Sequence, residues 1–287
     1  MTIAIALAAV LAQAPANRAL SGLNDPPKTP SRATAVEHVK VHGKSLQGNL
    51  EGDSADRDVA VYLPPSYASD KSRRYPVVYM QDGQNLSDPA VAFGGNTWQL
   101  DDGLRWLYER ARYPIVVGVH NTGEARLTEY SPFPDRRHGG GGGDRYIRFL
   151  VDTVKPRIDS AYRTRRDRDN TVIGGSSMGG LISLYAFFRR PSPFGHAIVM
   201  SPSVWFGGRE ILRFVERARQ TRGRMYLDVG TAEGAGTLRD VRALARLLRA
   251  KGFTRETLKY VEAQGHQHRE ADWAWRLPSA LEFVLRG

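Results

Sequence analysis

Short apolar runs rich in β-branched residues alternate along this chain with longer amphipathic stretches. Eight runs have the length and composition of buried strands: Glu37–Val41, Asp58–Leu63, Pro76–Gln81, Pro114–His120, Thr171–Gly174, His196–Met200, Arg224–Val229 and Thr257–Val261. Six stretches have the apolar spacing of helices: Trp98–Arg112, Asp144–Asp159, Gly179–Arg189, Glu210–Gln220, Leu238–Lys251 and Trp273–Leu285.

The order of these elements predicts an architecture. The first three strands follow one another without a helix, and strands and helices alternate from there to the end. Apolar strands flanked by helices indicate a mainly parallel sheet that is covered on both faces. A leading antiparallel pair followed by β–α–β units is the order of an α/β hydrolase, so we expect that fold with an eight-stranded sheet. Five glycines, Gly139–Gly143, predict a mobile loop before one helix.

The first 35 residues differ from the rest of the chain. Ile3–Ala12 is an unbroken apolar run, and small residues follow it in the A-x-A arrangement of a signal-peptidase site. The run is shorter than the roughly 20 residues that span a bilayer, so stable membrane insertion is not expected. We expect an export signal in residues 1–16, a flexible leader in 17–35 and one catalytic domain in 36–287. The expected location is periplasmic or secreted, and cytoplasmic if the run is not a signal.

Composition narrows the classes of function. The 287 residues include no cysteine, which excludes disulfides, Cys-ligated metals and Cys nucleophiles. The formal net charge is +11, but the arginines are scattered and no basic stripe is interleaved with aromatic residues, so nucleic acid is not an expected partner. The sequence has no metal-ligand cluster and no dinucleotide motif, so we expect neither a metal nor another cofactor. Composition does not indicate the oligomeric state.

The segment Thr171–Gly180, TVIGGSSMGG, carries the strongest chemical signal. Gly175–Gly179 fits the pattern G-x-S-x-G with Ser177 at its centre, between an apolar strand and an apolar helix. In this setting a sharp turn projects the serine hydroxyl above the sheet, where it can act as a nucleophile. The alternative is a glycine-rich turn that only packs or binds phosphate. Neighbouring Ser176 does not occupy the centre of the motif.

A serine nucleophile needs a base, and in α/β hydrolases the order along the chain is serine, acid, histidine. Two histidines, His266 and His268, follow the last predicted strand, and their spacing alone does not decide between them. Glu233 is the candidate acid, because it lies in the turn after the seventh strand. Asp228 is expected inside that strand and Asp240 on the helix that follows.

Acyl transfer also needs backbone donors aimed at the tetrahedral oxyanion. The amide of Met178, directly after the nucleophile, is one candidate. The loop after the third strand would supply the second, from Gly83 or Gln84. A plain turn is the alternative interpretation of Asp82–Gly83.

Several separated motifs extend the case beyond the serine: YLPPSY at Tyr62–Tyr67, PVVYMQDGQN at Pro76–Asn85, RLTEYSP at Arg126–Pro132, GGSSMGG at Gly174–Gly180, SPSVWF at Ser201–Phe206, DVGTAEG at Asp228–Gly234 and HREADW at His268–Trp273. Together they resemble the putative-esterase family of α/β hydrolases, which includes enterochelin and related siderophore esterases, S-formylglutathione hydrolases and feruloyl esterases. The resemblance covers nearly everything from Val36 to the end.

The resemblance implies a base and an acid. The family's base lies in a pattern like H-x-E-x-x-W, which His268, Glu270 and Trp273 match, so His268 is preferred to His266. The family's acid follows a G-T/I-x-D/E turn, and Gly230–Glu233 matches it. Some members work with a serine–histidine pair and little help from an acid.

The resemblance also suggests residues on the substrate side. Arg126 and Tyr130 resemble an element of siderophore esterases, with a salt-bridged loop as the alternative. Trp98 and Trp205–Phe206 are aromatic candidates for substrate contact, with ordinary packing as the alternative.

These residues predict a serine esterase that hydrolyses carboxylic esters through an acyl-enzyme on Ser177. Its expected partner is a small-molecule or saccharide ester, of the siderophore, acylated-carbohydrate or feruloyl type. Two alternatives stay open: acyl transfer to a sugar or lipid hydroxyl, and a catalytically inactive binding module.

Overall fold

The structure is a computed structural model that describes residues 35–48 and 54–286. The predicted export signal, residues 1–16, lies outside the described residues, and so does the predicted leader, 17–35, apart from Ala35. Within the described part of the chain, no helix is long and apolar enough to cross a membrane.

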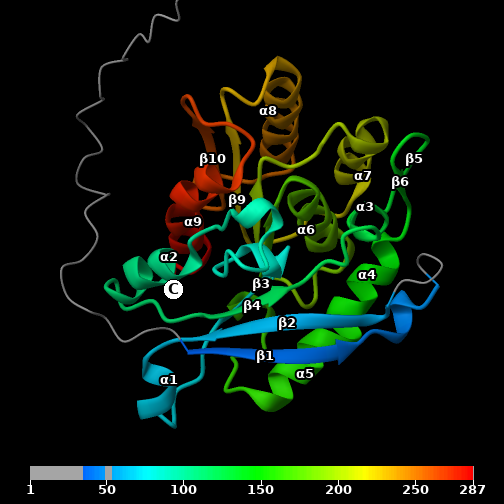
Figure 1. Ribbon diagram of the computed structural model, residues 1–287. Helices are drawn as coiled ribbons and strands as arrows, with labels where there is room; N and C mark the ends of the chain where they lie inside the picture. Colours follow the sequence, from blue (N-terminus) through cyan, green and yellow to red (C-terminus); the bar gives the residue numbers. More distant parts are fainter. Residues whose placement is uncertain (1–34, 49–53, 287) are drawn as a thin grey trace, which may run out of the picture. The chain divides into compact units, whose positions relative to one another are not determined.

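Eight strands form one central sheet (Figure 1): β1 (Ala35–His42), β2 (Asp56–Leu63), β3 (Val77–Gln81), β4 (Ile115–Val119), β7 (Thr171–Ser176), β8 (His196–Met200), β9 (Arg224–Gly230) and β10 (Leu258–Ala263). Their order across the sheet is β1-β2-β4-β3-β7-β8-β9-β10. Strand β2 runs antiparallel to both of its neighbours, and every other pair is parallel. The predicted α/β-hydrolase architecture with a mainly parallel sheet is confirmed.

Helices cover both faces of the sheet, which explains why inner strands such as β3, β4 and β8 are buried at every position. Along β3, Val77 and Tyr79 face one layer, whereas Val78 and Met80 face the other. The first layer contains α4 (Gly143–Phe149), α5 (Lys155–Ala161), α6 (Ser177–Arg189), α7 (Glu210–Arg217) and α8 (Ala235–Ala250). The second contains α2 (Leu100–Tyr108) and α9 (Glu270–Val284).

The helix predicted over Asp144–Asp159 has an irregular centre. Helices α4 and α5 are joined by a π-helical turn, η4 (Leu150–Val154). Pro156 lies in the first turn of α5 and has no N–H to donate to the preceding turn. The regular hydrogen-bond ladder therefore cannot run unbroken through this point, and the π turn lies where the proline interrupts it.

The glycine run Gly139–Gly143, predicted as a mobile loop, lies partly in secondary structure. Gly139–Gly140 forms strand β6, which pairs with β5 (Pro134–Asp135), and Gly143 begins α4. A Cβ atom on Gly143 would lie 2.6 Å from the backbone nitrogen of Pro132. A close approach of two backbones therefore requires glycine at this position, and the mobility of the run stays a prediction.

Several single-turn elements were not predicted, among them α1 (Ser66–Ser69), η2 (Gly83–Asn85) and α3 (Arg126–Glu129). Each has three or four residues, which is too short to show a helical period in the sequence. Two of them matter for the site, because η2 follows β3 directly and α3 begins at Arg126.

One buried histidine is held in a single neutral form. His196, at the start of β8, is 6% exposed. Its Nδ1 accepts a hydrogen bond from the backbone N–H of Arg224 at 2.9 Å, and its Nε2–H donates to the carbonyl of Asp169 at 3.0 Å. Burial lowers the pKa of His196 to about 4, and the nearby charge of Arg224 adds to this effect.

We expect this histidine to make the fold sensitive to acid. Between pH 6.5 and 4 the unfolded chain binds a proton at this position that the native protein does not, so stability falls as the pH falls. Full titration corresponds to about 3 kcal/mol of unfolding free energy. Urea unfolding at pH 7 and pH 4.5 measures the loss. We expect it to be smaller in His196→Asn and unchanged in the exposed control His38→Asn; equal losses in all three proteins would contradict the assignment.

Candidate active site

Ser177 lies at the sharp turn between β7 and α6. Its backbone is left-handed, with φ 55°, which is uncommon for a residue other than glycine. The two flanking glycines make the turn possible: a Cβ atom on Gly175 would lie 2.8 Å from the backbone of Gly179, and one on Gly179 would lie 3.0 Å from the side chain of Gln81. The alternative nucleophile, Ser176, is only 3% exposed at the end of the strand.

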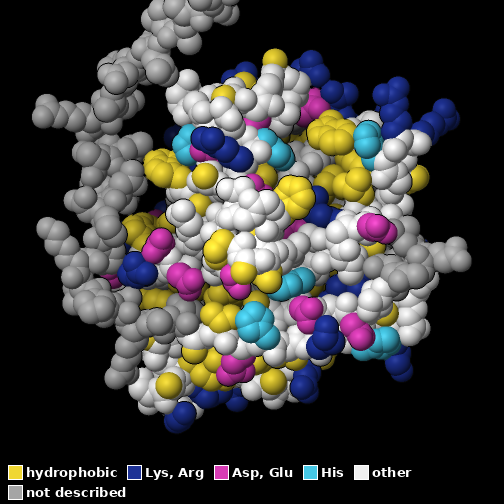
Figure 2. Space-filling view, in the orientation of Figure 1, with side chains coloured by type: hydrophobic (Ala, Val, Ile, Leu, Met, Phe, Trp, Pro, Cys, Tyr) yellow, Lys and Arg dark blue, Asp and Glu magenta, His cyan; other side chains and the backbone are white. Residues whose placement is uncertain are grey.

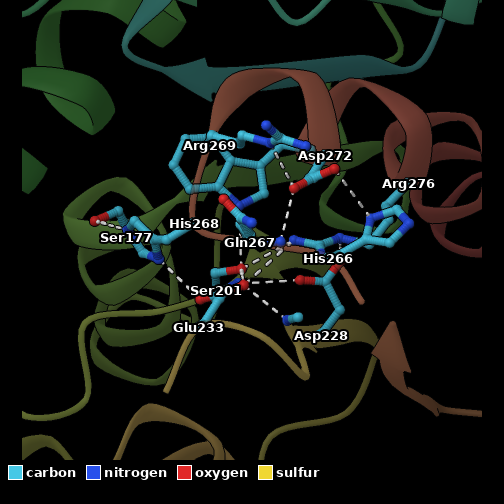
Figure 3. A network of polar contacts seen from close by, with 12 residues as sticks. Ser177, Ser201, Asp228, Glu233, His266, Gln267, His268, Arg269, Asp272 and Arg276 are labelled. Carbon is cyan, nitrogen blue, oxygen red and sulfur yellow. Dashed lines mark hydrogen bonds and ion pairs between the residues drawn. The ribbon is translucent and has the colours of Figure 1, made fainter. Parts of the chain in front are cut away.

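His268 lies between this serine and Glu233 and contacts both (Figure 3). His268 lies in the loop between β10 and α9, and its Nε2 is 2.9 Å from Oγ of Ser177. Its Nδ1 is 2.8 Å from Oε2 of Glu233, which follows β9. The imidazole also packs edge-on against Trp273, with ring centroids 4.9 Å apart. This geometry allows the imidazole to take a proton from the hydroxyl while the carboxylate orients it.

His266 points to a different group of side chains. Its Nδ1 lies 3.7 Å from Asp272, and its ring packs against Trp275 at 5.0 Å. Burial lowers the pKa of His266, and the positive charge of Arg276 acts in the same direction. The structure thus brings His268, and not His266, to the serine.

The carboxylate of Glu233 is completely buried and well supplied with donors. Its Oε1 accepts hydrogen bonds from the hydroxyl of Ser201 at 2.5 Å and from the backbone N–H of Gly230 at 2.7 Å. Burial favours protonation, but the hydrogen bonds from His268, Ser201 and Gly230 outweigh it, so the pKa of Glu233 is lowered. The acid is therefore held as a charged acceptor beside the imidazole.

A buried network beneath Glu233 was not identified from the sequence. Ser201 has φ 40°, and its hydroxyl accepts hydrogen bonds from Trp273 Nε1 and from Arg276, both at 3.0 Å. Arg276, 1% exposed, forms an ion pair with Asp228 at 2.9 Å and lies 3.7 Å from Glu233 (Figure 3). One signal was available: Arg276 is a charged residue within the apolar stripe of α9.

Ser203 is a second residue that the sequence did not assign. Its hydroxyl lies 3.2 Å from the hydroxyl of Ser177, and its backbone N–H donates to the carbonyl of Ser177 at 3.0 Å. The segment after β8 therefore lies directly against the nucleophile.

The two segments that carry the proposed oxyanion donors, the start of α6 and η2, also lie next to each other. Met178 lies in the first turn of α6, so its amide has no partner within the helix, and the same holds for Gly83 and Gln84 in η2. The side chain of Asp82 lies close to Gly179, because a Cβ atom there would be 3.2 Å from Oδ2 of Asp82. The side chain of Gln84 is engaged, with its Oε1 accepting from the backbone N–H of Asn121 at 3.2 Å.

The five residues expected on the substrate side have different surroundings, and one of them, Phe206, is completely buried. Trp98 is 1% exposed and packs against Trp273, and Tyr130 is fully buried. The expectation that these two contact substrate is not supported, because packing covers both rings. Arg126 is bound to Asp82. Trp205 is 46% exposed and packs edge-on against His138 at 5.6 Å. Among the described residues, no group of three His, Asp or Glu side chains is arranged to hold a metal ion.

Comparison with known proteins agrees with the fold. The sequence matches the putative esterase family over residues 54–284. The uncharacterised protein YbbA of Bacillus subtilis is 28% identical over 253 residues, which are 83% of this chain and 97% of that protein. The crystal structure of the BES protein from Bacillus cereus has a TM-score of 0.67 and 22% identity, and covers 91% of this chain and 98% of that one.

Relatives with a described activity are esterases. A siderophore triacetylfusarinine C esterase of Aspergillus fumigatus is 31% identical over 175 residues, which are 58% of this chain and 59% of that enzyme. Others are described as a siderophore enterobactin esterase, a ferri-bacillibactin esterase, an iron(III) salmochelin esterase and an endo-1,4-beta-xylanase/feruloyl esterase. The chain spans less than two thirds of the length of each of these enzymes. The family match covers most of the sequence, and the chain belongs to the putative esterase family of ester hydrolases.

Proposed function

We propose that this protein hydrolyses carboxylic esters through an acyl-enzyme on Ser177. The observation that carries the proposal is the continuous chain of contacts from Ser177 Oγ to His268 Nε2, and from His268 Nδ1 to Glu233, at 2.9 and 2.8 Å. His268 removes the hydroxyl proton as Oγ attacks the ester carbonyl carbon. It then gives this proton to the departing alkoxide, which leaves as the alcohol. Water, activated by the same imidazole, releases the acid and regenerates the serine.

In this mechanism the oxyanion of each tetrahedral intermediate is bound by backbone amides. Met178 supplies one donor from the first turn of α6, where the helix dipole also favours negative charge. Gly83 or Gln84 supplies the other from η2. Support for this pairing comes from the close contact between the loop that holds Asp82 and the helix that begins at Ser177.

We propose a siderophore, an acylated carbohydrate or a feruloyl-type ester as the substrate. The names of the relatives support the siderophore and feruloyl parts of this range. Trp205 supports an aromatic or sugar group near the site, because it is exposed two residues after Ser203. Figure 2 shows apolar, histidine and basic side chains together over the region of β5, β6 and α7. Hydrolysis rates for short acyl, feruloyl, acetyl-sugar and siderophore esters test the range; a protein inactive on all of them would contradict it.

Glu233→Gln is expected to lower kcat/KM by roughly three to four orders of magnitude, less than loss of the serine or the histidine. The amide cannot neutralise the imidazolium, and its NH₂ group can hold the ring in the wrong tautomer. Ester hydrolysis by purified variants measures the effect. Glu262→Gln is the matched control, because Glu262 pairs with Arg242 outside the site. A Glu233→Gln enzyme within about tenfold of wild type would mean that Ser177 and His268 work without the acid.

We propose that the catalytic domain, residues 36–287, is exported behind a signal in residues 1–16 and a leader in 17–35. The apolar run and the A-x-A sites support this proposal. Cell fractionation followed by N-terminal sequencing tests it. A mature protein that begins near Asn17, in the periplasm or the medium, is the expected result, and an unprocessed cytoplasmic protein would contradict it.

A further inference from the structure

The loop after β3 is held in an unusual conformation at the residue that precedes Gly83. Asp82 has φ 55° and ψ 46°, a left-handed backbone that residues with a side chain rarely adopt. Its side chain is nevertheless almost completely buried, with 4% exposed. A buried carboxylate in such a backbone persists only where its surroundings hold it in place.

Three side chains from one neighbouring segment supply these contacts. Arg126 holds the carboxylate of Asp82 with two parallel bonds, from Nε to Oδ1 at 2.7 Å and from Nη2 to Oδ2 at 2.8 Å. Asn121 donates from Nδ2 to Oδ1 at 2.6 Å. The hydroxyl of Tyr130 accepts a hydrogen bond from the backbone N–H of Asp82 at 3.1 Å. Both the side chain and the backbone of Asp82 are therefore fixed.

One contact from the same segment and one from α4 hold Gln84 and Gln81, on either side of Asp82. The backbone N–H of Asn121 donates to the side chain of Gln84, and Tyr146, which packs against Tyr130 at 5.0 Å, donates from its hydroxyl to Gln81. The chain is thereby held by hydrogen bonds at Gln81, Asp82 and Gln84, from the end of β3 into η2. Close packing also fixes the backbone of Gly83, because a Cβ atom on this residue would lie 2.2 Å from the backbone of Gly118.

We infer that Arg126 is a positioning residue, which acts through Asp82 to hold the second oxyanion donor in place. This inference rests on the proposed ester hydrolysis and goes beyond it. The Nε–Nη2 edge of the Arg126 guanidinium is occupied by Asp82, so this edge is not free to bind a substrate carboxylate. Arg126 acts instead toward the loop: it fixes Asp82, and Asp82 directly precedes the amides of Gly83 and Gln84.

The expected consequence is kinetic. An oxyanion donor stabilises the transition state more than the bound ester, and loss of one donor lowers kcat by about 10²–10³. A loosened loop misplaces the donor without removing it, so a smaller loss is expected. The effect should be the same for neutral and anionic esters, because it arises at the carbonyl oxygen that all esters share.

The test compares Arg126→Lys and Tyr130→Phe with wild type. Lysine keeps the charge but cannot form the two parallel bonds, and phenylalanine keeps the ring but removes the acceptor of the Asp82 N–H. We expect kcat for p-nitrophenyl acetate to fall about 10- to 100-fold in each variant, with KM changed less than about threefold. The inhibition constant of a boronic acid, which forms a tetrahedral adduct on the serine, should rise in parallel with the loss of kcat.

Two further proteins make the result decisive. Arg242→Ala breaks another two-bond pair between an arginine and a carboxylate, with Glu262, away from the site, and should leave kcat and the boronic acid affinity unchanged. Ser177→Ala tests the proposed function itself, since an active Ser177→Ala enzyme would overturn the serine mechanism. Unchanged kcat in both Arg126→Lys and Tyr130→Phe, with Ser177→Ala inactive, would overturn only the positioning role. A rise in KM confined to anionic esters would instead assign Arg126 to substrate binding.

Discussion

Replacing Ser177 with alanine is expected to lower kcat for p-nitrophenyl acetate by roughly four to six orders of magnitude while the protein stays folded. The hydroxyl is the only part of this residue that the mechanism uses, and its loss removes the covalent intermediate. Alanine has the same conformational preferences of the backbone as serine in this respect, and the packing of Gly175 and Gly179 holds the left-handed turn. Initial rates and thermal unfolding of the purified variant measure the two parts of this prediction.

The neighbouring serines are the matched controls for this experiment. Ser176→Ala changes a buried hydroxyl at the end of β7, and Ser203→Ala removes a hydroxyl that lies 3.2 Å from that of Ser177. Both are expected to retain most of the activity. Mass spectrometry after brief reaction with a slow ester should place the acyl group on the peptide that contains Ser177. Loss of activity in Ser176→Ala with activity retained in Ser177→Ala would show that the motif has been assigned in the wrong register.

The sequence predicted the strands well because most of them are buried on both faces. Each of the eight runs, such as Asp58–Leu63 and His196–Met200, overlaps the strand observed there. Apolar, β-branched composition and the flanking turns are local signals, so a strand can be identified from them without knowledge of the tertiary structure. The ends of the elements were less accurate. The helix predicted from Trp98 begins at Leu100. The backbone N–H of Trp98 instead donates a hydrogen bond to the carbonyl of Asn85, outside the helix.

The candidate site was predicted only as far as motifs and chain order reach. Ser177 has its own local pattern, whereas His268 and Glu233 were placed by their order and by resemblance to a family. The partners of Asp82 could not be found in this way, because Arg126 is 44 positions away and nothing in either segment marks the pair. The same limit explains why Arg126 and Tyr130 were expected at the substrate: exposure and pairing are properties of the folded chain.

The structure also changes how the glycines are interpreted. Five consecutive glycines suggest freedom of movement, yet Gly143 is required by the close approach of another backbone. Whether a glycine is mobile or required by packing depends on the atoms that a side chain at its position would contact. Amino-acid composition gives no information about these atoms. A similar argument applies to Arg276, whose charge alone suggests the surface of α9; its place in the apolar stripe of the helix indicates burial, and it pairs with Asp228 beneath the site.

His268→Ala is expected to lower kcat by nearly as much as Ser177→Ala, because the serine and its base act as one unit. His266→Ala is the matched control and should retain most of the activity, since His266 lies beside Asp272 and Trp275 and not at the serine. Added imidazole should restore part of the activity of His268→Ala, because a small base can enter the space that the missing ring leaves at an exposed position. It should have no such effect on Ser177→Ala, where the nucleophile itself is absent. Rates measured with and without imidazole for all three variants test the assignment, and loss of activity in His266→Ala with activity retained in His268→Ala would reverse it.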